Sequence, residues 1–344
     1  MNKAKYMIGV LALVLAGCTP AQEYHAPKEG TPQQEVVFAK GADVSWLTQL
    51  ESEGETFKTP SGVTTECMTL LRDECGVNAI RLRVWVNPAA GWNNISDVLV
   101  KARRAAALGM GVMIDFHFSD TWADPGHQEV PAAWASHDIG TLQKDVKDHV
   151  TEMLTALKTY GVTPQWVQIG NETRGGMMYP LGQYAADNRN FMLLVDAGYE
   201  AVKAIFPDSQ VIVHLDSGDR LDLYTRIFGY LANYGARYDM IGMSFYPDPE
   251  KWESATATLI SNIKSVSTSY KRPVMLCEIG MDYTEAEKCK STIARIMSEF
   301  GTSGDVLKGI FYWEPEAPAG YNGGYGKGCF VDGAPTVALD PFKE

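Results

Sequence analysis

The chain is poor in cysteine, with six among 344 residues and none in a Cys-x-x-Cys pair or a Cys/His cluster. Spacings of that kind build zinc sites, so the sequence predicts no structural zinc. Five cysteines follow Cys18, an odd number that leaves at least one thiol free. Cys67 and Cys75 fall about two turns apart on one apparent helix, too far apart to bridge each other. We expect the five to be mostly core residues, with one disulfide still possible.

Basic residues are scarce relative to acidic ones. Lys and Arg total 30 against 42 Asp and Glu, which gives a formal net charge of −12. A negative field repels the phosphate backbone of nucleic acids, and it hinders neutral substrates least. The sequence therefore predicts no nucleic-acid partner.

The chain also has no hydrophobic run long enough to cross a bilayer comfortably. The run MIGVLALVLAG, which follows Lys3 and Lys5, has the length of a secretory signal peptide. Its end, LAGC, resembles the lipobox of bacterial lipoproteins, which implies cleavage before Cys18 and a lipid on the Cys18 thiol. An ordinary secretory signal with an incidental Cys18 is the alternative.

The expected organisation follows from that N-terminus. It comprises a signal peptide at residues 1–17, a flexible tether at 18–35 and a folded domain at 36–344. The lipid would hold the domain outside the cytoplasm, at the cell surface or at the periplasmic face of the outer membrane.

Short apolar segments alternate with longer helical patterns from residue 36 onward. Eight segments have the pattern of buried strands: 36–45, 77–86, 111–118, 165–170, 210–216, 238–246, 273–280 and 307–314. Between them lie amphipathic patterns, for example the apolar residues from Leu142 to Leu157, after which Gly161 stands where a helix C-cap belongs. Consecutive parallel strands need helical crossovers, so eight such units predict an α/β fold of the (β/α)8 TIM-barrel type.

An open, doubly wound sheet is the alternative to the barrel. Its usual dinucleotide fingerprint, a set of glycines after the first strand, is missing from GADVSWL. The last predicted strand precedes PEAPAGYNGGYGKGCFVDGAP, which has no helical period. The eighth helix is therefore expected to be short or replaced by a loop, with TVALDPF as its remnant.

Two glutamates end predicted strands, Glu172 the fourth and Glu278 the seventh. The carboxyl ends of all strands meet at one mouth of a (β/α)8 barrel, where active sites are built, and these two strands stand nearly opposite each other. Two facing carboxyls can hydrolyse a glycosidic bond, one by protonating the leaving oxygen and the other by attacking or by activating water. A separation of about 5 Å predicts retention, and one of about 8 Å predicts inversion.

Motifs around these strand ends resemble one family. KGADVS, IRLRVWVNP, DFHFSDTWADPG, QIGNETRGG, SFYP, EIG and YWEP are similar to motifs of glycoside hydrolase family 53 in clan A, the endo-β-1,4-galactanases that act on type I arabinogalactan. The likeness runs from the first predicted strand to the last. It implies that residues 36–344 are a catalytic domain, a retaining endo-hydrolase of galactan. We expect it to work as a monomer without cofactor or metal.

The resemblance implies that Glu172 is the acid/base and Glu278 the nucleophile. A protonated Glu172 fits, because an ionised Glu278 nearby raises its pKa by repulsion. Arg83 and the Tyr246 hydroxyl are expected to keep Glu278 ionised. Asn171 is expected to bind the sugar hydroxyl next to the reacting carbon.

Residues around this pair are weaker candidates. His117 is expected to contact a sugar hydroxyl, with a core histidine as the alternative, and Trp313 is a candidate floor beneath the sugar. Trp85, Trp92, Trp122 and Trp134 are candidates for sugar stacking, each equally explained by packing under a loop. Three polar residues at strand ends either contact the substrate, as expected for Asp43, or only support their neighbours by hydrogen bonds: Asp43, His214 and Asp216. Spacing also suggests a metal set, composed of His117, Asp120, Asp124 and His127, but a hydrolysis by two carboxylates needs no metal.

The loop after the seventh predicted strand departs from the family. Some bacterial members hold calcium there in a long acidic loop. Here EIGMDYTEAEKCK enters a helix at once, and Thr284 and Glu287 are expected to form its capping box. We therefore expect no calcium site of that type.

Two other functions stay open from the sequence. Another clan A enzyme, a mannanase or a glucanase, would keep both glutamates and differ in its groove. A catalytically inactive polysaccharide-binding lipoprotein is the alternative outside enzymes, although a binding protein has no need of both carboxyls.

Overall fold

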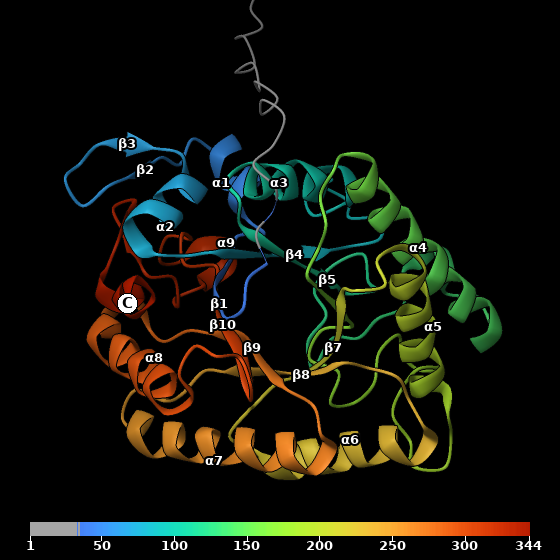
Figure 1. Cartoon of the computed structure of the whole chain (residues 1–344). Helices are drawn as coiled ribbons and strands as arrows, with labels where there is room; N and C mark the ends of the chain where they lie inside the picture. The colour runs from blue at the N-terminus through green and yellow to red at the C-terminus, as the bar shows by residue number, and fades with distance from the viewer. Residues whose placement is uncertain (1–32, 34) are drawn as a thin grey trace, which may run out of the picture. The chain divides into compact units, whose positions relative to one another are not determined.

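Eight parallel strands close into a barrel in the computed structural model, which describes residue 33 and residues 35–344 (Figure 1). The order around the barrel is β1-β10-β9-β8-β7-β6-β5-β4. The strands are β1 (Ala39–Asp43), β4 (Ala79–Val84), β5 (Gly111–Phe116), β6 (Trp166–Ile169), β7 (Gln210–Leu215), β8 (Met240–Phe245), β9 (Val274–Ile279) and β10 (Leu307–Trp313). Each lies inside one of the eight predicted segments, so the predicted (β/α)8 barrel is confirmed.

Helices surround the barrel and connect its strands. They are α1 (Leu47–Ser52), α2 (Cys67–Cys75), α3 (Ile95–Ala107), α4 (Ile139–Thr159), α5 (Asn190–Ile205), α6 (Leu221–Tyr234), α7 (Trp252–Tyr270) and α8 (Ala286–Phe300). Two short hairpins, β2 (Phe57–Lys58) with β3 (Thr64–Thr65) and β11 (Phe330–Val331) with β12 (Ala334–Pro335), lie outside the barrel.

The segment after β10 contains no full helix. A single turn, α9 (Tyr321–Gly324), and the 3-10 helix η3 (Val337–Lys343) stand where the eighth helix of the barrel would be. The η3 helix is the predicted remnant TVALDPF shifted by one residue, without Thr336 and with Lys343, and it packs on α8 and α2. Gly76, which ends α2 at φ +74°, allows this contact because a Cβ there would lie 2.3 Å from the Phe342 carbonyl oxygen.

Two local predictions need correction. The capping box at Thr284 and Glu287 is wrong: Asp282 accepts a hydrogen bond from the Thr284 backbone N–H, a 3-10 turn at Tyr283–Glu285 follows, and α8 begins only at Ala286. The possible disulfide is also wrong for the described cysteines, because all five are free and buried. The signal peptide, Cys18 and most of the tether lie outside the described residues. Within the described residues no helix is long and apolar enough to cross a membrane.

The barrel interior has two layers of different character. The layer near the N-terminal ends of the strands is apolar and consists of Ala39, Ala79, Met113, Trp166, Ile212, Met240, Met275, Cys277 and Phe311. Toward the C-terminal ends the buried side chains become polar and charged: Asp43, Arg81, Asp115, Gln168, His214 and Glu278. An apolar plug below and a polar layer above place the chemistry at the C-terminal mouth.

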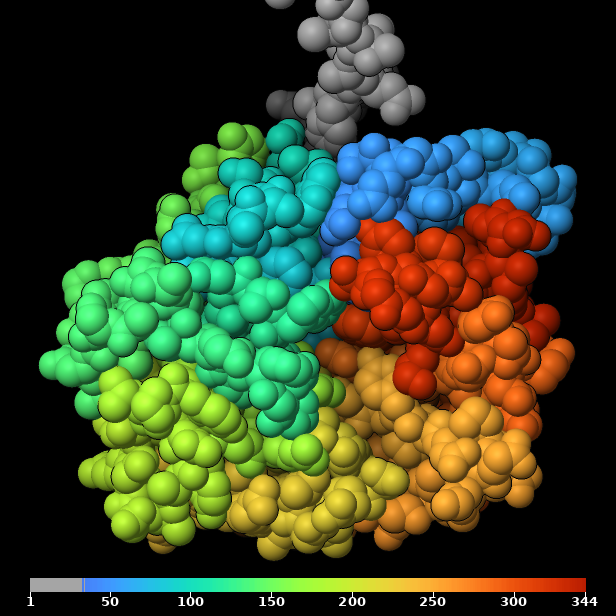
Figure 2. All heavy atoms as spheres, turned by 180° about the vertical axis from the view of Figure 1, so that it is seen from behind, coloured from blue at the N-terminus to red at the C-terminus, as the bar shows by residue number. Residues whose placement is uncertain are grey.

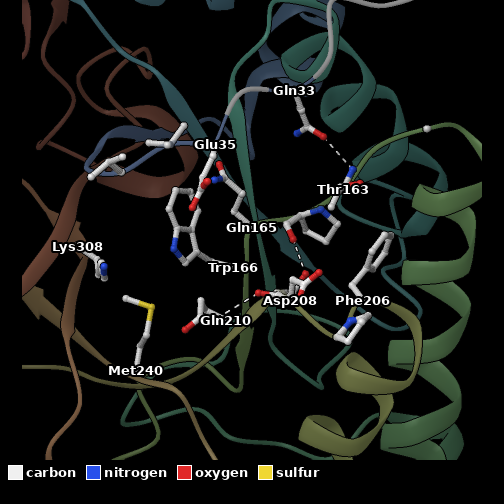
Figure 3. Close-up of a pocket in the computed structure, with 16 residues that line it drawn as sticks. Gln33, Glu35, Thr163, Gln165, Trp166, Phe206, Asp208, Gln210, Met240 and Lys308 are labelled. Atoms are coloured by element: carbon white, nitrogen blue, oxygen red, sulfur yellow. Dashed lines mark hydrogen bonds between the residues drawn. The ribbon is translucent and has the colours of Figure 1, made fainter. Parts of the chain in front are cut away.

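A cavity of about 740 Å³ opens at the other end of the barrel, where strands begin (Figure 3). Trp166, Gln210 and Met240 line it together with Phe206 and Gln33. Neither candidate glutamate lies there. The opposite face of the domain has a hollow between the loop after β5, drawn in green, and the segment after β10, drawn in red (Figure 2).

Candidate active site

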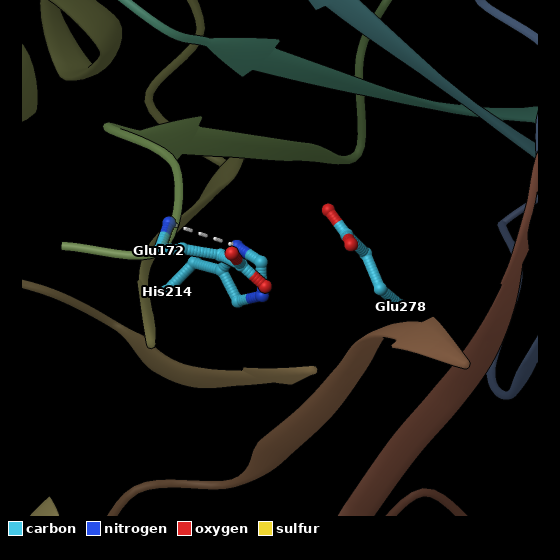
Figure 4. Close-up of side chains that lie close together, drawn as sticks. All are labelled: Glu172, His214 and Glu278. Carbon is cyan, nitrogen blue, oxygen red and sulfur yellow. Dashed lines mark hydrogen bonds between the residues drawn. The ribbon is translucent and has the colours of Figure 1, made fainter. Parts of the chain in front are cut away.

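Glu172 and Glu278 come together at the C-terminal ends of β6 and β9 (Figure 4). One carboxylate oxygen of each lies within 4.8 Å of the other and of a ring nitrogen of His214. The separation that the sequence left open is therefore the short one, of the order that a direct attack on the sugar requires.

Arg81 and Tyr246 hold Glu278. The Arg81 guanidinium forms an ion pair with Glu278 Oε1 at 2.9 Å, and the Tyr246 hydroxyl donates to Oε2 at 2.7 Å. Burial raises the pKa of Glu278 to about 7, although the positive charge of Arg81 and then the Tyr246 hydrogen bond lower it. Glu278 thus has cationic and hydroxyl partners that favour its ionised form.

The predicted partner Arg83 does not contact Glu278. Its Nη1 forms an ion pair with Glu314 Oε1 at 2.5 Å, and its guanidinium lies 4.3 Å from the ring centre of Trp122. Alternation along β4 points both Arg81 and Arg83 into the barrel, but Arg83 stands two residues closer to the mouth. It reaches the residue that follows β10 instead of the barrel centre, so the predicted role belongs to Arg81.

Glu172 has a different environment from Glu278. Burial, and then repulsion from Glu278, raises the pKa of Glu172 well above its usual value. The Ser244 hydroxyl donates a hydrogen bond to its Oε1 at 2.6 Å. The backbone of Glu172 is left-handed, at φ +48°, a conformation that costs about 1 to 3 kcal/mol for residues other than glycine.

A buried polar network links the two glutamates. Arg81 donates to Asp43 (2.7 Å), to Asp115 (2.8 Å) and to Asn171 Oδ1 (2.9 Å) in addition to Glu278. Asp43 also accepts hydrogen bonds from Ser45 and is fully buried, so it orients Arg81 and cannot touch a sugar as predicted.

Asn171 is held from several sides. Its Nδ2 donates to the Ala123 carbonyl oxygen at 2.8 Å, and its Oδ1 accepts from Gln168 Nε2 at 3.0 Å as well as from Arg81. Its backbone oxygen accepts from Gln128 at 2.8 Å. One Nδ2 hydrogen keeps the capacity to bind a substrate hydroxyl, as predicted for this residue.

His117 is a structural residue rather than the predicted sugar contact. Its Nε2 lies 3.0 Å from Asp115, while Nδ1 accepts from Trp85 Nε1 at 3.2 Å and from the Ala123 backbone at 3.1 Å. Both ring nitrogens are used, and the residue is 4% exposed. The alternative of a core histidine is the correct one, and Trp85 is tied to it.

The metal set suggested by spacing does not assemble. Asp120 accepts hydrogen bonds from the backbone of Asn87 and Ala132, and Asp124 pairs with the exposed His127 at 2.9 Å. Among the described residues, the ligand atoms that lie close enough together to hold a metal ion belong to Glu172, His214 and Glu278. Two of these three, Glu172 and Glu278, are the carboxyls of the candidate hydrolysis itself.

Four tryptophans form an aromatic wall beside this network. Trp313 at the end of β10 lies 5.9 Å from Trp122 and 5.3 Å from Trp46, measured between ring centres, and Trp85 lies 5.3 Å from Trp122. Trp46 is buried, and the other three are partly exposed. Trp134 does not join them, because it packs on His149 beside α4.

Several residues of the site were missed or undervalued in the sequence. Ser244 precedes Tyr246 by two positions in SFYP, and Gln168 is a polar residue inside an apolar strand, so alternation and polarity could have identified both. Arg81 lies two residues before Arg83, so strand alternation predicts that both side chains point into the barrel. Trp46 lies just beyond the motif KGADVS, and no local signal marks it.

Comparison with known proteins agrees with this geometry. The family model described as glycosyl hydrolase family 53 matches residues 39–303. A probable arabinogalactan endo-β-1,4-galactanase A from Aspergillus terreus is 34% identical over 316 residues, which cover 84% of this chain and 88% of that protein. An endo-β-1,4-galactanase from Bacillus subtilis is 30% identical over 308 residues, covering 81% of this chain and 70% of that protein. A solved structure from a study of two fungal β-1,4-galactanases has a TM-score of 0.80 at 28% identity and covers 88% of this chain and 98% of its own.

Proposed function

The chain belongs to glycosyl hydrolase family 53, and from this we propose that it cleaves internal β-1,4-galactosidic bonds of galactan or type I arabinogalactan with retention of configuration. Relatives from a fungus and a bacterium carry the name endo-β-1,4-galactanase, which supports the bond and the polymer. The observation that carries the mechanism is the approach of Glu172 and Glu278 to within 4.8 Å. Retaining enzymes place their carboxyls about 5 Å apart, whereas inverting enzymes leave room for water.

The two carboxyls take separate roles in this proposal. Glu172, whose pKa is raised more strongly, carries the proton that the leaving oxygen needs. Glu278, paired with Arg81, attacks the anomeric carbon and forms a covalent intermediate, which water activated by Glu172 then hydrolyses. Asn171 binds the adjacent hydroxyl, and Trp313 forms the apolar floor beneath the sugar.

We also propose that the enzyme is a lipid-anchored, extracytoplasmic protein. The support is the LAGC sequence at Cys18 and the short hydrophobic run before it. A polymer too large to enter a cell has to be cut outside it, which agrees with this location.

A product profile on linear β-1,4-galactan, with mannan and β-glucan in parallel, tests the function. We expect galacto-oligosaccharides whose length decreases with time, and we expect them from galactan alone. In the NMR spectrum, the β-anomer of the new reducing end should appear first. Early α-anomer would contradict retention, and comparable cleavage of mannan or β-glucan would point to another clan A activity.

The matched control is Glu278→Ala. It should abolish hydrolysis while oligosaccharide binding, measured by calorimetry, persists. A variant with substantial hydrolysis would remove Glu278 from the role of nucleophile.

A further inference from the structure

Behind Glu172 lies a short chain of hydrogen bonds that the two-carboxylate mechanism does not use. Ser244 on β8 donates its hydroxyl hydrogen to Glu172 Oε1 at 2.6 Å. The Oγ of Ser244 lies 2.8 Å from Nε2 of His214 on β7. Ser244 and His214 are almost completely buried, so water does not compete for these bonds.

The neighbours of His214 indicate which ring nitrogen carries hydrogen. Burial, and then the charge of Arg81, lowers the pKa of His214 well below its usual value, so the ring is neutral. Two N–H donors approach Nδ1: the backbone of Glu172 at 3.5 Å (Figure 4) and Gln168 Nε2 at 3.0 Å. An Nδ1 that accepts these hydrogens leaves the ring hydrogen on Nε2, which then donates to Ser244.

Asn171 fits this arrangement. Its Oδ1 lies 2.9 Å from Nδ1 of His214, but this oxygen already accepts a hydrogen from Arg81 at 2.9 Å and therefore has no need of one from His214. One of the two Gln168 Nε2 hydrogens goes to Asp115 Oδ1, and the other is available for Nδ1 of His214.

Ser244 thus receives one hydrogen bond and has a single hydrogen to give. That hydrogen points at Oε1 whether Glu172 is protonated or ionised, because an Oε1 without hydrogen accepts it in both states. The proton of a neutral Glu172 must then sit on the other oxygen, Oε2.

We propose that Ser244, held by His214, is a positioning residue that confines the transferable proton of Glu172 to Oε2. The proposal rests on the role of Glu172 as acid/base given above. In the first step a Glu278 oxygen bonds to the anomeric carbon as the glycosidic bond breaks, and the glycosidic oxygen takes the proton from Oε2, which leaves Glu172 a carboxylate. In the second step a water oxygen bonds to the anomeric carbon as its bond to Glu278 breaks, and a proton of that water goes to Oε2. Ser244 donates to Oε1 throughout, so no hydrogen bond has to rearrange.

The groups that face this pair define its charge environment. Around Glu172 these are Glu278 from β9, Asp216 from the end of β7 and Asp124 from the loop after β5. Around His214 they are Arg81 from β4 and Asp115 and His117 from β5. Against this acidic surrounding, the Ser244 hydrogen bond is the influence that lowers the pKa of Glu172.

The test is Ser244→Ala, measured on two substrates across pH. On galactan we expect kcat to fall about tenfold, and the alkaline limb of kcat/KM to move to higher pH because the pKa of Glu172 rises. On an aryl β-galacto-oligoside with a good leaving group, which needs little protonation, the loss should be smaller. Ser244→Thr should restore most of the activity because it keeps the hydroxyl, and Ser244→Cys, with a weaker donor, should shift the limb in the same direction.

Ser209→Ala is the matched control. Ser209 is equally buried and donates to the Pro164 carbonyl oxygen, but at the opposite end of the barrel. It should leave the alkaline limb and the ratio between the two substrates unchanged. An unmoved limb in both Ser244→Ala and Ser244→Cys, with equal loss on both substrates, would overturn the proposal. A wild type that does not cleave galactan, or an active Glu172→Gln, would instead refute the proposed function.

Discussion

Glu172 and Glu278 have the same side chain, and their partners give them different protonation. Glu278 faces Arg81 and Tyr246, whereas the carboxyl of Glu172 faces a serine hydroxyl and the charge of Glu278 itself. Burial raises both pKa values, but the Arg81 charge lowers that of Glu278, whereas the charge of Glu278 raises that of Glu172. As pH increases, Glu278 therefore loses its proton first. The state with Glu278 ionised and Glu172 protonated, which the retaining mechanism needs, exists between these two titrations.

The acid limb of the pH profile follows from this order. Activity should fall as pH drops through the value for Glu278, about 7, because the nucleophile becomes protonated. Tyr246→Phe removes a hydrogen bond that lowers the pKa of Glu278, so the acid limb of kcat/KM should move to higher pH. A shift of about one unit is expected, since one pKa unit corresponds to about 1.4 kcal/mol and a hydrogen bond to a charged group contributes about that much.

Tyr234→Phe is the control for this shift. The Tyr234 hydroxyl donates to the Ala186 carbonyl oxygen at 3.0 Å on the outside of the domain. Its removal should leave the limb in place. If the limb of Tyr246→Phe also stays in place, Tyr246 does not tune Glu278.

The sequence identified the candidate catalytic residues that lie directly at strand ends, and it was less informative about residues deeper in the barrel. Glu172 and Glu278 each stop an apolar run, so their position was readable. The choice between Arg81 and Arg83 was not, because alternation gives the direction of a side chain and not its depth in a closed barrel. The hydrogen bonds of His117 come from Trp85, just after β4, and from Ala123 in the loop after β5, and no local pattern reveals them.

The segment after β10 contains a second pair of buried carboxyls, Glu314 and Glu316. Glu314 accepts from the Trp46 backbone at 3.1 Å and pairs with Arg83. Glu316 is 2% exposed, and neither of its carboxylate oxygens has a hydrogen-bond partner among the described residues as long as it is ionised. Burial, and then repulsion from Glu314, raises the pKa of Glu316 well above its usual value. The protonated form of Glu316, which this shift favours, can donate to Glu314.

A raised carboxyl pKa makes stability depend on pH in a defined direction. The folded chain keeps the Glu316 proton after the unfolded chain has lost it, so this contribution is complete at low pH and declines as pH rises above about 4.3. Glu316→Gln keeps a donor and does not titrate. Between pH 5.5 and 7.5 the free energy of unfolding of the wild type should fall, relative to this variant, by roughly 1 to 3 kcal/mol.

Urea unfolding at both pH values measures this difference. Glu152→Gln, an exposed position on α4, serves as the control and should follow the wild type. If the free energy of unfolding changes equally between the two pH values in the wild type and in Glu316→Gln, Glu316 is ionised in the folded protein.

All eight barrel strands could be predicted from apolar segments of the sequence, because strands that are buried on both faces contain few polar residues. The weak eighth helix was also readable, since PAGYNGGYGKG cannot maintain a helical period. The start of α8 was not, because Thr284 is used by Asp282 in a preceding 3-10 turn. Two capping arrangements compete over those few residues, and the sequence is compatible with both.

In the described domain, the candidate active site and the first described residue, Gln33, lie at opposite ends of the barrel. The polar layer and both glutamates lie at the C-terminal ends of the strands. Gln33 lies near the N-terminal ends, where its side chain accepts from the Thr163 backbone at 2.8 Å and donates to the Met110 carbonyl oxygen at 3.2 Å. The described part of the chain therefore begins at the end of the barrel opposite the candidate active site.

Cys18→Ser tests the proposed anchor. Each buried lipid CH₂ contributes about 0.8 kcal/mol to membrane binding, and the substitution removes the thiol that would carry a lipid chain. We expect the variant to move from the membrane fraction to the soluble fraction. Its kcat on soluble galactan should equal that of the wild type, because Cys18 is not among the residues that form the site around Glu172 and Glu278. Cys329→Ser, at a buried and free cysteine, controls for the loss of a thiol and should leave the fractionation unchanged. If Cys18→Ser and the wild type fractionate alike, Cys18 carries no anchor, and the N-terminal run is an ordinary secretory signal.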